Sequence, residues 1–201
     1  MFKKFILIIV LVFCMVTLCY ANETIVTVET QIGPFDFAGE LMMESQLISE
    51  FGQGHVQIFQ VGNKILEKKH IYYIADEKLW VEISLSHVLD RNLERDVESI
   101  LVTKKELCDK KFKPKKTFGP LITSKGIAIG NPIDKVLNVY GKPTISIDIA
   151  KDKLFSELGD ELKLQSGKVL RYISNRPYES LGAEFYFDAE GLHSILISSS
   201  E

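Results

Sequence analysis

The chain has few of the residues that build active sites and cross-linked folds. It contains three cysteines, and two of them, Cys14 and Cys19, lie in an apolar N-terminal run, so Cys108 is left without an intramolecular mate. This pattern excludes a disulfide framework, and we interpret Cys108 as an incidental thiol. Metal-binding motifs are also absent, since the four histidines show neither an HxxxH nor an HExxH spacing: His55, His70, His87 and His193. We therefore predict no enzyme activity, no metal and no cofactor.

An excess of basic residues is lacking as well. The chain has 24 lysines and arginines against 27 aspartates and glutamates. Without Lys3 and Lys4, which belong to the N-terminal run, the net charge is about minus five. An acidic protein repels the phosphate backbone, so nucleic acid is not the expected partner.

The N-terminal residues 1–21 have the order of an export signal. Two lysines precede an apolar run, and the segment ends in Ala21 at a position where small residues favour cleavage. We predict cleavage after Ala21 and a periplasmic or extracellular protein. Two alternatives stay open, both of which would give membrane association: retention of the segment as an anchor, and lipidation of Cys19.

Five pairs of short segments recur in the same order along the chain and predict a tandem duplication. For example, Ile32-Gly33-Pro34 is repeated 86 residues later as Phe118-Gly119-Pro120. We predict a first unit at 22–103, a second unit at 117–201 and a linker at 104–116 that contains seven lysines. The linker is a solvated connection or a surface for anionic lipid or an acidic partner.

Each predicted unit is α+β, with a short helix or helix pair packed on an antiparallel sheet of about three to four strands. In the second unit Asn131 is the expected N-cap, the helix begins at Pro132, and Gly141 ends it. The first helix is expected near Glu44 to Phe51, and a further short helix at Lys153 to Leu158. Alternating apolar residues predict the strands, as in 79–85 and 185–188.

Two segments of the second unit carry a resemblance to a known group. The sequence GIAIGNPIDKVLNVYGKP at 126–143 and GAEFYFDAEGLHSILI at 182–197 resemble small exported bacterial modules. These are the β-lactamase-inhibitor-protein-like group and the small lipoprotein of the outer-membrane protein assembly machinery. The resemblance implies a non-enzymatic protein that binds partners across a concave sheet surface. It brings no catalytic residues to this chain.

Trp80 and Tyr186 are the predicted protein-binding residues. Strand alternation places each ring beside polar neighbours on the face expected to be more exposed to water. The same positions are also compatible with rings that are covered by the other unit, a loop or an adjacent helix. Our leading hypothesis is an exported, non-catalytic module of the bacterial envelope that binds another protein, as an assembly factor or inhibitor. The alternative is a protein that binds an envelope lipid or a small ligand between the units and along the lysine-rich linker.

Overall fold

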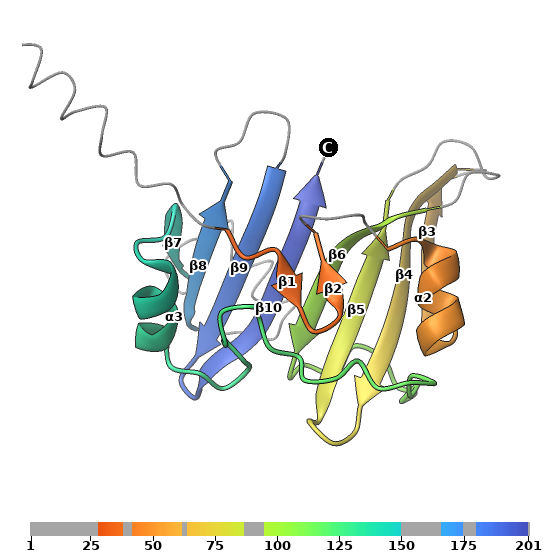
Figure 1. Ribbon diagram of the computed structural model, residues 1–201, viewed down its shortest axis with the longest axis horizontal. Helices are drawn as coiled ribbons and strands as arrows, with labels where there is room; N and C mark the ends of the chain where they lie inside the picture. The colour runs from red at the N-terminus through yellow and green to blue at the C-terminus, as the bar shows by residue number, and fades with distance from the viewer. Residues whose placement is uncertain are drawn as a thin grey trace, which may run out of the picture.

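The computed structural model describes residues 28–37, 42–61, 64–86, 95–149, 166–174 and 180–200 (Figure 1). The predicted export signal and the predicted helix at 153–158 lie outside these residues. Within them, eight strands form one antiparallel sheet in the order β3-β4-β5-β6-β10-β9-β8-β7. The strands are β3 (His55–Val61), β4 (Lys64–Ile74), β5 (Leu79–Leu85), β6 (Val97–Thr103), β7 (Ile145–Asp148), β8 (Lys168–Ile173), β9 (Ser180–Asp188) and β10 (Gly191–Ser200).

The prediction of an α+β fold with two separate sheets is wrong. The described chain is mainly β, and its two helices, α2 (Glu44–Phe51) and α3 (Ile133–Tyr140), have eight residues each. One continuous sheet forms because β6 pairs with β10, from Ser194 opposite Thr103 to Ser198 opposite Ser99. This pairing joins strands about 90 residues apart, and it removes the two free edges that separate sheets would have exposed.

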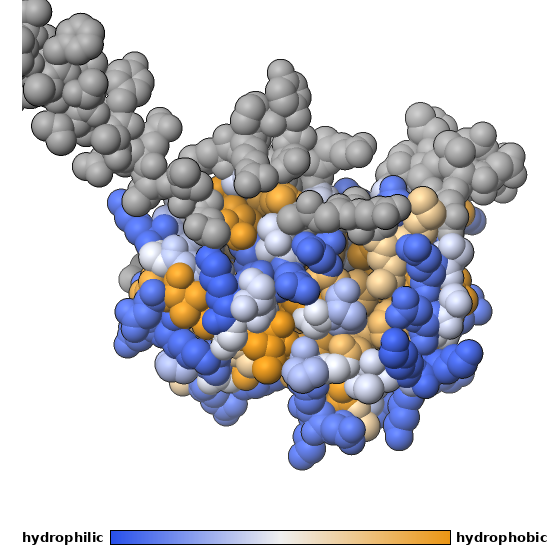
Figure 2. Space-filling view, viewed as in Figure 1, coloured by the Kyte–Doolittle hydropathy of each residue, from blue (hydrophilic) through white to orange (hydrophobic). Residues whose placement is uncertain are grey.

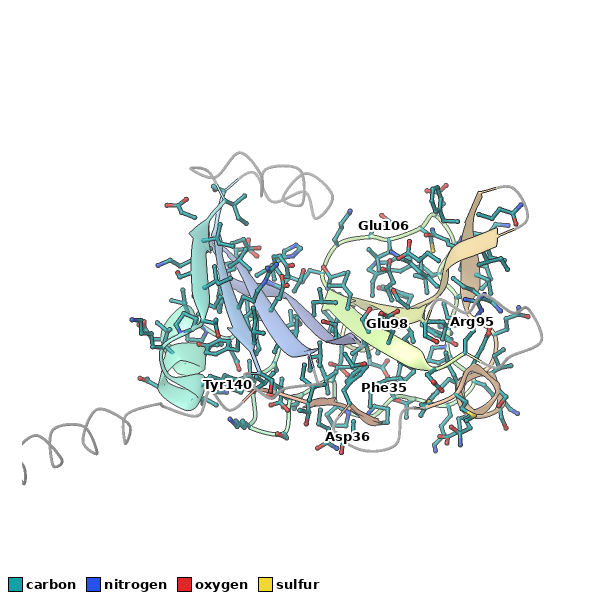
Figure 3. All side chains as sticks on the ribbon, turned by 90° about the horizontal axis from the view of Figure 1, so that it is seen from above. Phe35, Asp36, Arg95, Glu98, Glu106 and Tyr140 are labelled. Atoms are coloured by element: carbon teal, nitrogen blue, oxygen red, sulfur yellow. The ribbon has the colours of Figure 1, made fainter. Side chains whose placement is uncertain are left out.

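The helices lie on one side of the sheet together with a small hairpin of β1 (Gln31–Ile32) and β2 (Phe35–Asp36). Figure 3 shows Phe35, Asp36 and Tyr140 on this side and Glu106 on the other. We call the two surfaces the helix-side face and the opposite face. One hydrophobic core fills the helix-side face across both halves of the sheet, and it includes Ile32, Phe35, Leu47, Phe51, Val81, Ile100, Val136, Tyr140, Phe185 and Ile195.

The prediction of the second helix is confirmed except at its first turn. Val136 and Tyr140 are buried, and the helix ends at Gly141, whose positive φ of 75° suits glycine and whose N–H donates to the Leu137 carbonyl. The N-cap position is Pro132. Asn131 does not cap the helix, because its Oδ1 accepts from the Ala128 N–H and from Lys135 Nζ instead.

A buried carboxylate ties the N-terminal part of the described chain to α3. Glu29 is 2% exposed and accepts hydrogen bonds from two backbone amides, from Ser124 and, at 2.5 Å, from the Tyr140 hydroxyl. Burial, reinforced by the bond to Glu29, raises the pKa of Tyr140 above its usual range. The bonds to Ser124 and Tyr140 span 95 and 111 positions, so the segment before β1 is part of the folded core.

Candidate protein-binding edge

Trp80 and Tyr186 lie in one row across the middle of the sheet. Trp80 on β5 is opposite Thr103 on β6, which is opposite Ser194 on β10, which is opposite Tyr186 on β9. The neighbours Val81 and Phe185 belong to the helix-side core, so alternation assigns Trp80 and Tyr186 to the opposite face. Between the two rings, the hydroxyls of Thr103 and Ser194 are fully buried and 2.7 Å apart.

Both rings are buried, each with 3% of its surface exposed. Trp80 packs against Tyr73 with ring centroids 5.0 Å apart. The Tyr186 hydroxyl donates to Glu184, whose other oxygen lies 2.7 Å from Arg171 Nε. The rings are therefore covered, and these contacts come from residues of the sheet itself, Tyr73 on β4 and Glu184 on β9. A contribution of either ring to binding stays a prediction.

An exposed edge strand offers a more accessible surface. β3 pairs with β4 along one side, and no described strand pairs with its other side. Its sequence, HVQIFQV, contains no proline, no lysine, no arginine and no acidic residue. Native proteins commonly protect exposed edges with charges or prolines, because unpaired N–H and C=O groups recruit further strands. β3 has neither protection.

Ile58 and Phe59 in the centre of β3 are the two most exposed large hydrophobic side chains among the described residues, at 51% and 60%. Successive strand residues point to opposite faces, so Ile58 and Phe59 present apolar surface on both sides of the edge. The pairing with β4 shifts in register between Phe59 and Gln60. An added strand would meet both apolar side chains along with the free backbone groups.

The other end of the sheet is less suited to strand addition. Its edge strand, β7, has only four residues, and Ile147 within it is buried. Ile145 is the exposed apolar residue there, at 38%. A short edge presents fewer backbone groups to a partner, so the two edges differ in both length and apolar exposure.

Figure 2 shows the helix-side face, where polar side chains surround the apolar groups.

Contacts at the start of β3 fix its position against β4. Gly54 precedes the strand, and a Cβ at this position would lie 2.7 Å from the Ile71 carbonyl oxygen, so only glycine permits this approach. The next residue, His55, stacks its ring on Phe112 with centroids 5.2 Å apart. The strand is thus held from its first residues, even though no described strand pairs with its outer side.

Helix α2 lies beside β3 and β4 (Figure 1) and is attached to β4 by Glu44. Glu44 Oε1 is 2.8 Å from His70 Nε2 and also pairs with Lys68. Burial alone would raise the pKa of Glu44, but hydrogen bonds from Lys68 and His70 outweigh it and hold the pKa below its usual value. This ion pair keeps α2 against the strand that supports the exposed edge.

A shallow pocket lies between the start of α3 and the β9–β10 hairpin. Its volume is about 410 Å³, and residues lining it include Gly130, Pro132, Ile133, Lys168, Phe187, Asp188 and Glu190.

Across the part of the chain that the structure describes, no group of three or more His, Cys, Asp and Glu side chains is placed to hold a metal ion.

Sequence reasoning did not select Ile58 or Phe59. The available signal was the composition of this segment, which has no lysine, arginine or acid. Such a composition is typical of a strand, but it does not indicate where that strand lies in the sheet. A strand of this composition is equally compatible with a buried central position. Only the strand order shows that β3 is at an edge.

Comparison of the chain with models of protein families, with curated proteins and with solved structures gives no match. The resemblance to the inhibitor-like and assembly-lipoprotein modules therefore stays a prediction. Among the described residues, no helix is long and apolar enough to cross a membrane.

Proposed function

We propose that this chain is an exported, non-catalytic module of the bacterial envelope that binds another protein, as an assembly factor or inhibitor does. We further propose that binding occurs at β3, where an extended segment of the partner adds to the sheet. The observation that carries this proposal is the open edge of β3 with Ile58 and Phe59 exposed at its centre. Strand addition to a free sheet edge is a recurrent mode of peptide recognition.

Backbone and side-chain contacts would have different roles in this interaction. The free N–H and C=O groups of a seven-residue strand supply hydrogen bonds that any extended segment can make. Ile58 and Phe59 would add selectivity for a partner with apolar residues on both faces of its strand. Covering these two side chains contributes about 1 kcal/mol each, because roughly half of each is already buried.

The test is affinity capture from bacterial envelope extracts with the chain that follows the predicted cleavage, Asn22–Glu201. We expect the double variant Ile58→Lys/Phe59→Lys to retain at least about tenfold less of the partner, because charge at an edge opposes strand addition. Circular dichroism and thermal unfolding check that the variant is folded.

The matched control is Ile145→Lys/Ser146→Lys, which adds the same two positive charges at two exposed positions of the other edge strand. It should capture the partner as well as the unmodified chain does. Equal recovery by the β3 variant, or equal loss in the β7 control, would contradict the assignment of the binding site to β3.

A further inference from the structure

Residues 104–116, the basic segment, hold seven of the 24 lysine and arginine residues of this protein. The segment contains seven lysines, with Glu106 and Asp109 as its only acids, so its net charge is plus five. The whole chain carries minus three, and the remainder therefore carries minus eight. Positive charge is thus concentrated in a short segment of an otherwise acidic protein, which indicates an anionic partner for that segment.

The basic segment has no helix or strand, yet backbone hydrogen bonds attach it to the fold at three points. The Lys104 N–H donates to the His193 carbonyl, the Tyr73 N–H to the Phe112 carbonyl, and the Lys115 N–H to the Phe51 carbonyl. Phe112 also stacks on His55. These contacts fix the backbone of the basic segment against the sheet and α2, so the segment carries its lysines at defined positions on the surface of the fold.

Six of the seven lysines are exposed: Lys104, Lys110, Lys111, Lys113, Lys115 and Lys116. Three of these have partners, namely Glu190 at 3.8 Å from Lys104, the Tyr73 ring at 4.5 Å from Lys111, and Glu50 at 3.6 Å from Lys116. Within the described part of the chain, Lys110, Lys113 and Lys115 form no ion pair with an acidic side chain. Their charges are available to an external anion.

The chemistry of the segment favours a broad anionic surface over a single phosphate group. It contains no arginine, the residue suited to bidentate recognition of phosphate, and lysine acts as a point charge. Its apolar residues Leu107, Phe112 and Pro114 are half-buried, so they are not free to insert into a membrane. The acidic remainder of the protein opposes wrapping by a long polyanion such as nucleic acid.

We propose that the basic segment docks this protein onto the surface of a bilayer that contains anionic phospholipid. Clusters of four to eight lysines or arginines are typical of such electrostatic contacts, with each residue near the surface contributing about 1 kcal/mol. The contact is peripheral, reversible and sensitive to salt. The membrane proposal does not rest on strand addition at β3. The variants that test it leave β3 unchanged, so the two proposals can fail separately.

The experiment is sedimentation of the Asn22–Glu201 chain with vesicles of phosphatidylcholine, with and without about one third phosphatidylglycerol. We expect binding only to the anionic vesicles, and weaker binding as the salt concentration rises. The variant Lys110→Gln/Lys113→Gln/Lys115→Gln should bind on the order of 100-fold more weakly. It should remain folded, because these side chains make no ion pair among the described residues.

The matched control replaces three exposed lysines elsewhere, Lys78, Lys142 and Lys168, with glutamine, which gives the same net charge. The control should bind within about threefold of the unmodified chain. Equal weakening in both variants would mean that only net charge matters and would overturn the proposal. Absence of vesicle binding, equal binding to neutral vesicles, or capture of an acidic protein or nucleic acid by the segment in place of vesicles would overturn it too.

Discussion

Buried polar side chains connect parts of this protein that are far apart in sequence. Glu29 accepts from Tyr140 across 111 positions, Thr103 bonds to Ser194 across 91, and Glu44 contacts His70 across 26. A buried polar group costs free energy unless it finds a partner, so each of these contacts is specific for the native arrangement of its two segments.

At the residue scale, Glu44 predicts a dependence of stability on pH. Its pKa in the folded protein is below the usual value of 4.5, so the folded state binds its proton less tightly than the unfolded chain does. The resulting stabilisation is fully present above about pH 4.5 and is lost as the pH falls through the folded pKa. Glu44→Gln should lower the free energy of unfolding by about 1 to 2 kcal/mol at pH 7, measured by urea titration.

The difference between Glu44→Gln and the unmodified protein should shrink in acid, since the unmodified protein then loses the same carboxylate charge. Glu50→Gln on the same helix is the control. Glu50 is exposed and lies 3.6 Å from Lys116, so its replacement should change the stability by less than about 0.5 kcal/mol. A pH-independent loss in Glu44→Gln would show that the ionised carboxylate is not responsible.

At the element scale, β3 depends on close backbone contact at its start. A side chain at Gly54 would meet the Ile71 carbonyl oxygen at 2.7 Å and the Tyr72 ring at 3.0 Å. Because the first of these atoms belongs to the backbone of the paired strand, relief requires β3 and β4 to separate. The same glycine therefore affects both the stability of the pairing and the presentation of Ile58 and Phe59.

Gly54→Ala should lower the free energy of unfolding by about 1 to 3 kcal/mol through this overpacking. Urea denaturation measures the loss, and hydrogen exchange at the amides of β3 should show its greatest increase there. The control is Gly182→Ala on β9, where an added Cβ would make ordinary contacts at 3.6 Å or more. Similar losses in both variants would argue against the close approach as the cause.

At the scale of the whole molecule, the β6–β10 pair turns two four-stranded halves into one sheet. The helix-side core is likewise continuous, with Leu47 and Val81 from one half and Val136 and Phe185 from the other in the same cluster. Neither half retains its full core without the other. This continuity predicts that the described part of the protein unfolds as one unit.

Urea unfolding followed by tryptophan fluorescence and by circular dichroism should therefore give one coincident transition. The sole tryptophan, Trp80, reports on the first half, whereas circular dichroism reports on both. Ile195→Ala removes a fully buried side chain at the junction and should cost about 2 to 5 kcal/mol. Its transition should move to lower urea without splitting. Two separate transitions in the unmodified protein would contradict a single cooperative core.

Local patterns correctly predicted many of the elements but not their assembly. The first helix was expected near Glu44 to Phe51 and is observed at those residues, and the alternation at 79–85 marks β5. The strands of the two predicted units are present. The two separate helix-covered sheets that we predicted are not observed. Strand propensity indicates which residues are extended, but it does not indicate which strands pair across about 90 residues.

The candidate site shows the same division. The sequence indicated Trp80 and Tyr186 by their polar neighbours, but the structure buries both. Tyr73, opposite Trp80 on the next strand, packs against its ring, and Tyr186 belongs to an apolar cluster with Ile147 and Val169 of neighbouring strands. Ile58 and Phe59 give no such signal in the sequence. Their exposure follows from the absence of a described strand on the outer side of β3.

The sequence by itself determined the local conformations: the two short helices, the alternating strands, the glycine that ends α3, and the concentration of lysines at 104–116. These features depend on residues close in the chain, whose steric and hydrophobic preferences act locally. Only the tertiary structure decided the continuous sheet, the burial of Trp80 and Tyr186, and the open edge at β3. Pairing between β6 and β10 is chosen by packing between segments distant in sequence, and that choice determines which strands remain at the edges.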